Sequence, residues 1–363
     1  MIPVLPGFTL DTEVRKPIYY FLSKRIPIIQ MRQEMKKIRV IQYGLGPIGC
    51  STARTILSRA NLELVGAVDI DPAKVGKDLG DLLGSEKRGL KVAKTLAEVL
   101  AKTKADVVMH TTSSYFDLFK GQILEIVQAG LDVVSTSEEL SFPWLAHPED
   151  AAEIDAAAKK AGKSVLGTGI NPGFLMDSLP LFLTAICERV DRIEIARIQN
   201  ASLRRGPFQK KIGSGLTVEQ FKAVMAQGRM AHVGLVQSVG MIFNTLGKTL
   251  VKYEETIEPV IAKKRIKTSF FEVKPGQPCG LNQVARGYDE KGEFLTLTFI
   301  AALDSDVDED RIKISGQPGL EVILKGTHGD VATRSIAVNA IRRVKEAAPG
   351  LVTMRDLPIV TIG

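Results

Sequence analysis

The sequence has few of the residues that most often build metal sites and disulfide frameworks. Among its 363 residues are three cysteines and four histidines, and each lies far along the chain from any other of its kind. The odd number of cysteines and the lack of a C-x-x-C pair argue against a disulfide framework and a zinc site. We therefore expect no metal, and a reducing, cytoplasmic environment.

The sequence also lacks a long apolar run, since no stretch approaches the ~20 apolar residues that a membrane span requires. Its net charge of +7 is a mild excess spread along the chain, and aromatic residues make up only 6%. Nucleic-acid binding would need more basic surface with interleaved aromatic side chains. We therefore expect neither a membrane nor a nucleic acid as a partner, and a surface that suits anionic cofactors. The length favours two domains.

Residues 1–34 differ in pattern from the rest of the chain. Lys24 and Arg25 interrupt their apolar stretch, whereas the apolar core of a secretory signal peptide is continuous. We expect an extension outside the fold. An arm that packs on a partner subunit is the alternative, because the segment is less polar than an ideal disordered tail.

A glycine-rich loop follows the first apolar run, residues 38–43, and precedes a helical pattern that begins at Cys50. Strand, G-x-G-x-x-G and helix in this order form the fingerprint of a dinucleotide site. The first glycine permits a tight turn, the second lets the backbone approach the pyrophosphate, and the third lets helix and strand pack closely. The helix N-terminus adds N–H donors and partial positive charge. The loop residues that we assign to the cofactor are Gly44, Gly46, Pro47, Ile48 and Gly49.

An aspartate ends the second apolar run. Asp69 lies twenty residues after Gly49, where a carboxylate that accepts hydrogen bonds from the adenosine ribose is expected. Alternatively, Asp69 caps the Asp-Ile-Asp-Pro turn that it begins. A carboxylate here disfavours a 2′-phosphate, so NAD is favoured over NADP, although the nearby Lys74 and Lys77 keep both cofactors open.

Strand and helix patterns then alternate as far as residue 166, which indicates a parallel sheet with ligands beyond the carboxyl ends of its strands. Thr111, Thr112 and Ser113 follow one strand and are assigned to the cofactor crevice. Glu138 and Glu139 follow the next, and adjacent side chains of an extended segment point opposite ways. One of them, shielded from water, would have a raised pKa and could act as a general base. Alternatively, both are solvated acids at a helix start.

The segment Gly167–Phe174, GTGINPGF, joins the last strand of this half to an apolar helix expected over residues 174–187. Its glycines would allow close approach to a flat ring, with Asn171 on the cofactor and Phe174 as a wall of the substrate pocket. Alternatively, this loop is a hinge between domains.

The remaining sequence is mainly strand-like and suggests an antiparallel sheet. A basic loop, residues 200–215, could clamp an anionic group or be solvated. The lone His232 is interpreted as structural. The sequence thus predicts an α/β protein with a Rossmann-type doubly wound parallel sheet over residues 35–168 and 327–363. Residues 169–326 form an α+β substrate and dimerisation domain, and the C-terminal helix returns to the dinucleotide domain.

Several distinctive stretches carry a family resemblance: VIQYGLGPIG, VDIDPAKVGKDLG, VVSTSEELSFPW, GTGINPGFLMD, ASLRRGPFQKKIGSGLT and THGDVAT. In these stretches the sequence resembles the 2,4-diaminopentanoate dehydrogenase family and related NAD(P)-dependent amine dehydrogenases, which are similar in fold to dihydrodipicolinate reductases. The resemblance covers the chain from Lys36 onward and leaves out residues 1–34.

The resemblance implies oxidative deamination of an amine to a ketone with release of ammonia, reversible as reductive amination. Glu138 is the matching catalytic carboxylate, since related homoserine dehydrogenases carry a lysine at what looks like the same place. It would take a proton from the substrate ammonium and then from the attacking water. Glu139, Phe174 and Arg197 are assigned to the substrate pocket. Whether Glu138 or Glu139 is the base, and whether the substrate is 2,4-diaminopentanoate or a simple amine, stays open.

Three other functions are weighed against this one. A dihydrodipicolinate reductase would carry a His-His segment with a nearby lysine, whereas the histidines here are isolated. A homoserine dehydrogenase-like oxidoreductase is a further enzymatic alternative. A dinucleotide-sensing regulator would need a binding module for DNA or a partner protein, which the sequence does not suggest.

Overall fold

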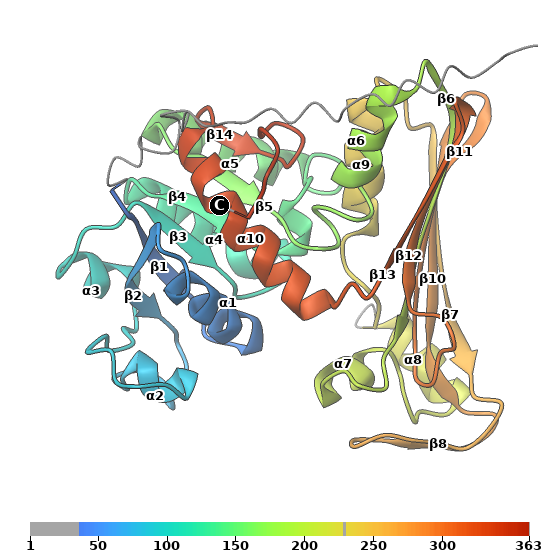
Figure 1. Cartoon of the computed structure of the whole chain (residues 1–363), viewed down its shortest axis with the longest axis horizontal. Coiled ribbons are helices and arrows are strands. Elements are labelled where there is room, and N and C mark those ends of the chain that lie inside the picture. The colour runs from blue at the N-terminus through green and yellow to red at the C-terminus, as the bar shows by residue number, and fades with distance from the viewer. Residues whose placement is uncertain (1–35, 228–229, 363) are drawn as a thin grey trace, which may run out of the picture. The chain divides into compact units, whose positions relative to one another are not determined.

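The structure is a computed structural model that describes residues 36–227 and 230–362 (Figure 1). The N-terminal extension predicted for residues 1–34 lies outside the described residues. Two six-stranded sheets and a two-stranded sheet organise the described part of the chain.

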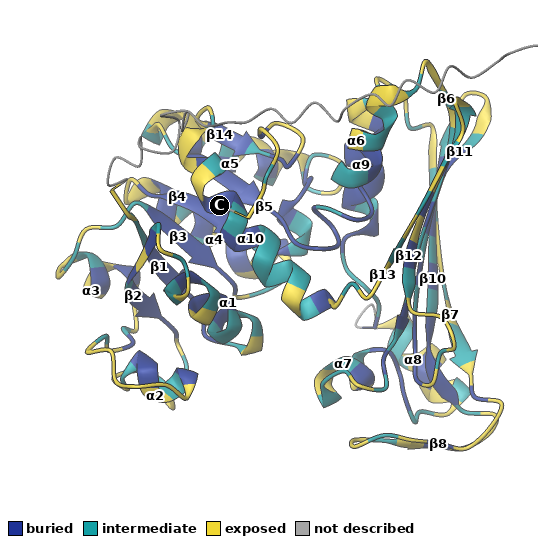
Figure 2. Ribbon diagram, in the orientation of Figure 1, coloured by how far each residue is buried: buried dark blue, intermediate teal, exposed yellow. Residues whose placement is uncertain are grey.

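The first sheet is parallel throughout, in the strand order β14-β5-β4-β3-β1-β2. Its strands are β1 (Ile38–Tyr43), β2 (Leu62–Val68), β3 (Val107–His110), β4 (Asp132–Ser135), β5 (Ser164–Gly167) and β14 (Gly350–Val352). Every residue of β3, β4 and β5 is buried, as expected for apolar strands covered on both faces (Figure 2). The chain order reverses beside β1, so the crevice beyond the carboxyl ends of β1 and β3 is where such sheets bind ligands.

Helices cover both faces of this sheet. The helices α1 (Pro47–Leu57) and α10 (Gly329–Glu346) pack on one face, and α4 (Phe116–Gln128) and α5 (Pro148–Ala161) pack on the other. The short α2 (Leu79–Leu83) and α3 (Leu96–Leu100) follow β2. Because α10 comes after the second sheet in the chain yet packs on the first, the predicted Rossmann-type fold with a returning C-terminal helix is confirmed.

The second sheet has the strand order β13-β12-β6-β11-β10-β7. Its strands are β6 (Arg189–Asn200), β7 (Lys252–Ile261), β10 (Pro278–Asp289), β11 (Gly292–Ala302), β12 (Glu309–Gln317) and β13 (Leu320–Lys325). The strands β6 and β11 run parallel, so the sheet is mixed rather than antiparallel as predicted. The difference arises because β6 inserts between β11 and β12, which follow it much later in the chain.

The helices α6 (Ser178–Leu183) and α9 (Leu235–Thr245) belong to a core cluster with β6, β11 and β12, whereas α7 (Gly206–Lys211) and α8 (Val218–Ala226) join a separate cluster. The hairpin of β8 (Ile266–Lys267) and β9 (Glu272–Val273) belongs to that second cluster. The helix predicted over 174–187 is shorter, because the Asp177 carboxylate accepts hydrogen bonds from the Gly173 and Ser178 amides and caps a later start. Within residues 36–227 and 230–362, no helix is long and apolar enough to cross a membrane.

Candidate active site

The glycine loop holds two residues that only glycine can occupy. Gly44 has φ +89°, and a Cβ there would lie 2.6 Å from the Thr111 carbonyl oxygen. A Cβ on Gly49 would lie 2.0 Å from the carbonyl oxygen of Gly44. Gly46 is different, because its Cβ would meet nothing within 4 Å and it is the N-cap of α1 without a side-chain cap. Open space therefore borders the N-terminus of α1, where the first-turn N–H groups of a helix lack intrahelical partners and can bind a phosphate.

This difference between the glycines predicts two distinct variants. Gly49→Ala should destabilise the protein by roughly 2 kcal/mol or more, because the new methyl group overlaps backbone that cannot move aside. Gly46→Ala should leave stability within about 1 kcal/mol and weaken NADH binding about tenfold or more, because the methyl group occupies the space of the pyrophosphate. Thermal unfolding and fluorescence titration with NADH measure the two effects. Equal NADH affinity of Gly46→Ala and wild type would contradict the assignment.

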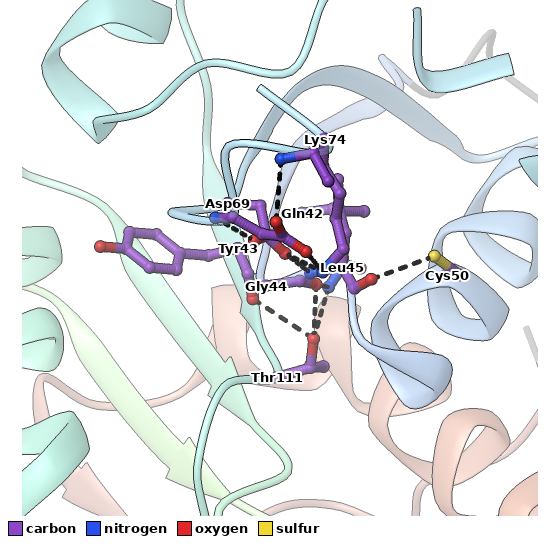
Figure 3. A network of polar contacts seen from close by, with 10 residues as sticks. Gln42, Tyr43, Gly44, Leu45, Cys50, Asp69, Lys74 and Thr111 are labelled. Atoms are coloured by element: carbon purple, nitrogen blue, oxygen red, sulfur yellow. Dashed lines mark hydrogen bonds and ion pairs between the residues drawn. The ribbon is translucent and has the colours of Figure 1, made fainter. Parts of the chain in front are cut away.

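Asp69 ties the end of β2 to the glycine loop (Figure 3). Its Oδ2 accepts a hydrogen bond from the Leu45 amide at 2.7 Å, its Oδ1 accepts one from the Asp71 amide at 2.8 Å, and Lys74 Nζ lies 3.1 Å from Oδ2. Burial alone would raise the pKa of Asp69, but these hydrogen bonds outweigh it and hold the pKa below its usual value. Asp69 therefore caps the following turn, the alternative raised by its sequence context, and also anchors the loop.

Thr111, which follows β3, and Gln42 of β1 also fix this loop (Figure 3). The hydroxyl of Thr111 donates to the Gly44 carbonyl at 2.9 Å, and the buried Gln42 amide donates to that hydroxyl at 2.8 Å and to the Gly44 carbonyl at 3.0 Å. Gln42 could not be singled out from the sequence, because one polar residue in an apolar strand carries no signal of its own. Together these contacts hold the turn in one geometry before any ligand arrives.

A cavity of about 330 Å³ lies beyond the carboxyl ends of β3 and β4 and extends to the second sheet. It brings together many of the predicted site residues, namely Ile48, Thr111, Thr112, Ser113, Glu138, Asn171 and Arg197. Gly44, Gly46, Pro47, Gly49 and Asp69 do not line it and belong instead to the neighbouring glycine loop and strand end. The cavity and the loop thus form two ends of one candidate site.

Glu138 and Glu139 point into different surroundings. Glu138 lines the cavity, where burial raises its pKa, while a hydrogen bond from Ser114 and the charge of Lys211 oppose that rise. Glu139 Oε2 accepts a hydrogen bond from the Phe116 amide at 2.6 Å at the start of α4 and lies 3.4 Å from His147 Nε2. The structure therefore places Glu139 outside the cavity, in contrast to its assignment to the substrate pocket.

Phe174 also lies outside this cavity. It lines a second, largely apolar cavity of about 440 Å³ between α6 and the C-terminal segment 354–360. The reason is the turn before it, where Gly173 has φ +119° and its amide donates to Asp177 at 2.7 Å, so the chain leaves the sheet edge. The pocket wall predicted at Phe174 is thus not part of the site that contains Glu138.

The loop before that turn directs an amide into the cavity. Asn171 is buried and lines the cavity, and its side-chain oxygen and nitrogen both lack hydrogen-bond partners among the described residues. Arg204 and Arg205 also line the cavity, and the Nε atom of each is buried and makes no hydrogen bond among the described residues. Buried polar groups are normally paired, so this group of unpaired atoms fits a site that a polar ligand completes.

Four cationic side chains line the cavity, those of Arg197, Arg204, Arg205 and Lys211. Arg197 forms a buried ion pair with Asp310 at 2.7 Å, and Asp330 pairs with Arg204 at 2.9 Å and with Arg205 at 3.7 Å. The acidic side chains of the lining are Glu138 and Asp330, so the cavity has an excess of positive charge. Part of the predicted basic loop is the helix α7, which brings Lys211 to the cavity.

His232, interpreted from the sequence as structural, also lines the cavity. Its ring stacks on Phe299 with 4.5 Å between centroids. Burial, with the nearby charges of Lys211 and Arg197, lowers the pKa of His232 to about 3. A lone histidine between two helices gave no sequence signal for this position. In the described residues, no group of three or more His, Cys, Asp or Glu side chains could hold a metal ion.

The chain matches two family models. Residues 174–362 match the 2,4-diaminopentanoate dehydrogenase C-terminal domain. Residues 38–165 match the model of the N-terminus of dihydrodipicolinate reductase. The second match covers β1 to β4 and the start of β5, and the first covers the second sheet, α10 and the C-terminal segment with β14.

Similar proteins span nearly the whole chain. The 2,4-diaminopentanoate dehydrogenase of Acetoanaerobium sticklandii is 32% identical over 90% of this chain and 94% of its own length. An amine dehydrogenase of Streptomyces virginiae is 23% identical over 89% of this chain and 96% of its own. The solved structure of an amine dehydrogenase from Mycobacterium smegmatis superimposes with a TM-score of 0.80 at 27% identity, covering 90% of this chain and 97% of that one.

Proposed function

The chain belongs to the 2,4-diaminopentanoate dehydrogenase family, and we propose that it oxidises a carboxylate-bearing amine of the 2,4-diaminopentanoate class to the ketone. Ammonia is released, NAD or NADP is reduced, and the reverse reaction is a reductive amination. The observation that carries this proposal is the half-buried carboxylate of Glu138, with its raised pKa, in a cavity lined by four cations. A single general base faces a site that attracts an anionic group.

The residues of the glycine loop fit a nicotinamide dinucleotide. The N-terminus of α1 at Gly46 would hold the pyrophosphate, and the unpaired amide of Asn171 would hold the carboxamide of the nicotinamide. Thr112 and Ser113 line the cavity on the side of β3. When bound, the nicotinamide ring supplies the acceptor for the hydride that leaves the amine-bearing carbon.

Glu138 would handle the protons of the reaction. Its carboxylate takes a proton from the substrate ammonium, which frees the nitrogen lone pair, and passes that proton to solvent. The regenerated carboxylate then takes a proton from the water that attacks the iminium carbon and passes it to the departing amine, which leaves as ammonia. The negative charge also stabilises the cationic iminium while it exists. Ser114 orients the carboxylate through its hydrogen bond, and Lys211 limits the rise of the pKa of Glu138.

The cationic lining supports an amine that also bears a carboxylate over a simple amine. Arg204, Arg205 and Lys211 come from the segment around α7, and each is able to donate hydrogen bonds to a carboxylate. Asp330 is shared between Arg204 and Arg205, so a plain alkyl amine would leave positive charge in the cavity that one carboxylate only partly balances, which is unfavourable. The matching dihydrodipicolinate reductase model is that of the N-terminus, over residues 38–165, so this match gives no support to that substrate.

The test is reduction of NAD or NADP by the full-length protein on mixing with 2,4-diaminopentanoate, compared with 2-aminopentane. We expect turnover of the first amine and a kcat/KM for the second that is lower by a factor on the order of 100, because the second has no carboxylate. If no amine is oxidised while NADH still binds, the proposal is wrong. If 2-aminopentane is the better substrate, the carboxylate preference is wrong.

The cofactor is proposed to be NAD, with NADP accepted through Lys74. Asp69 would face the adenosine ribose, and Lys74, paired with it at 3.1 Å, compensates its negative charge. Lys74→Ala should therefore lower kcat/KM for NADP about tenfold while changing that for NAD less than about threefold. Steady-state rates with both cofactors measure this ratio. Lys77→Ala is the matched control, and an equal change of the ratio in both variants would contradict the role of Lys74.

We further propose that the chain divides into a dinucleotide domain, residues 35–168 and 327–363, and a substrate domain, residues 169–326.

We also propose that the protein is a cytoplasmic homodimer. Ala196, Thr298 and Val284 are neighbours in register on three adjacent strands of the second sheet, and they are only half-buried although they are uncharged. Such a flat face suits burial against a second copy. A mass of one chain by light scattering at micromolar concentration would contradict the dimer.

A further inference from the structure

His232 is held rigidly at the cavity. Its backbone amide donates to Gln283 Oε1 at 2.7 Å, and its carbonyl accepts from Gln283 Nε2 at 2.8 Å. Its ring is stacked on Phe299, with planes 22° apart. Backbone and ring are therefore both fixed before a ligand arrives, and the direction of each ring nitrogen is fixed with them.

The two ring nitrogens have different surroundings. The backbone carbonyl of Asn171 lies close enough to the imidazole to oppose the fall of its pKa. Nε2 is buried and makes no hydrogen bond among the described residues, so we assign the proton to Nδ1, facing that carbonyl. A neutral imidazole has one donor and one acceptor, which leaves the lone pair of Nε2 as the acceptor. Since the pKa of His232 is lowered to about 3, the ring is neutral under physiological conditions.

An acceptor of this kind is unusual in a cavity rich in cations. The carboxylate of Asp330 is already engaged by Arg204 and Arg205, and Glu138 is proposed for the reacting amine. Asn171 presents a donor together with an acceptor, as a carboxamide partner would require. Nε2 of His232 is thus a neutral, purely accepting group next to charges that would bind a carboxylate, and leaving it unpaired is unfavourable.

This inference rests on the proposed function. We propose that His232 determines specificity by accepting a hydrogen bond from a second, non-reacting ammonium group on the carbon that bears the substrate carboxylate. Cations that hold the carboxylate bring this ammonium group into the same part of the cavity, where a neutral acceptor pairs with it. The enzyme would therefore select amines that end in an α-amino acid over amines that end in a carboxylate alone.

The test compares 2,4-diaminopentanoate with 4-aminopentanoate, which has the same skeleton, carboxylate and reacting amine but no 2-amino group. His232→Phe keeps the aromatic stack and removes the acceptor, and His232→Gln keeps an acceptor. In His232→Phe, kcat/KM for 2,4-diaminopentanoate should fall about 10- to 100-fold, mainly through KM, with less than about threefold change for 4-aminopentanoate. His232→Gln should retain part of the preference for 2,4-diaminopentanoate over 4-aminopentanoate. NADH affinity, measured by fluorescence, should be the same in all three proteins.

The outcomes separate this inference from the proposed function. If wild type oxidises neither amine, the proposed function is wrong and this inference with it. If wild type oxidises both amines but His232→Phe lowers kcat/KM equally for the two, or for neither, His232 does not recognise the second ammonium group. Weaker NADH binding in both variants would assign Nε2 to the cofactor and would also overturn the inference.

Discussion

Glu138→Gln is expected to lower kcat for amine oxidation by roughly 10²- to 10⁴-fold, the usual contribution of a general base, because an amide cannot take up the substrate proton. NADH affinity should change little, since the glycine loop is untouched. Glu139→Gln is the matched control. It lies outside the cavity at the start of α4 and should keep the rate while costing about 1 kcal/mol of stability. If Glu139→Gln loses the rate and Glu138→Gln keeps it, the assignment of the base is off by one residue.

The raised pKa of Glu138 sets the sign of two pH effects. Oxidation needs the carboxylate, so kcat/KM should fall as the pH drops through this raised pKa, at a higher pH than for an ordinary glutamate. When folding raises the pKa of a carboxyl group, the protonated group contributes fully to the stability of the folded protein at any pH below the pKa it has in the unfolded chain. That contribution is lost as the pH rises through the pKa that the group has in the folded protein. Glu138→Gln should therefore melt at a higher temperature than wild type at neutral pH, with the difference vanishing in acid.

Arg197→Met is expected to destabilise the protein by about 3–5 kcal/mol, because it leaves the partner of a buried ion pair uncompensated. The side chains of Arg197 and Asp310 are only 2% and 6% exposed, and burial raises the pKa of Asp310. Adding Asp310→Leu to Arg197→Met should recover most of the loss, since two apolar side chains then replace the pair. Chemical denaturation monitored by circular dichroism measures all three proteins.

Arg311→Met serves as the control for this ion pair. Its side chain, also in the second sheet, is 49% exposed and pairs with Glu309 at 2.8 Å, so its removal should cost less than about 1 kcal/mol. If Arg197→Met is as stable as Arg311→Met, the buried pair does not support the cavity. If the double variant is no more stable than Arg197→Met, the loss does not come from the uncompensated carboxylate.

The parts of the fold that local sequence determines were predictable. The glycine loop between Tyr43 and Cys50, and the alternation of apolar runs with helical patterns, depend on neighbours within a few residues. They led to the parallel sheet and to the edge on which Glu138 and Asn171 lie. The parallel pairing of β6 with β11 was not predictable in this way, because about a hundred residues separate the two strands.

Residues of the site could be predicted from the sequence only where their place directly after a strand of the parallel sheet is enough to bring them to the cavity. Glu138 and Glu139 are adjacent, and local pattern could not say which faces the cavity, since that depends on how the turn after β4 packs on α4. Phe174 lies beyond the turn that follows β5, so its place after the strand does not determine where its side chain lies. The hydrogen bond between Gly173 and Asp177 directs the chain away from the cavity. His232 reaches the cavity through Phe299 and Gln283, two residues of distant strands.

The returning helix α10 limits how this enzyme can be recombined with its relatives. It lies in the sequence matched by the C-terminal family model, yet Ala337 and Ile341 pack with Ala53 and Ile56 of α1. Asp330, at its other end, pairs with Arg204 near α7. A chimera made by exchanging residues 38–165 would therefore keep the cationic part of the cavity lining but acquire a foreign α1–α10 interface. Cofactor grafts in this family need to carry the inner face of α10 along with the N-terminal half.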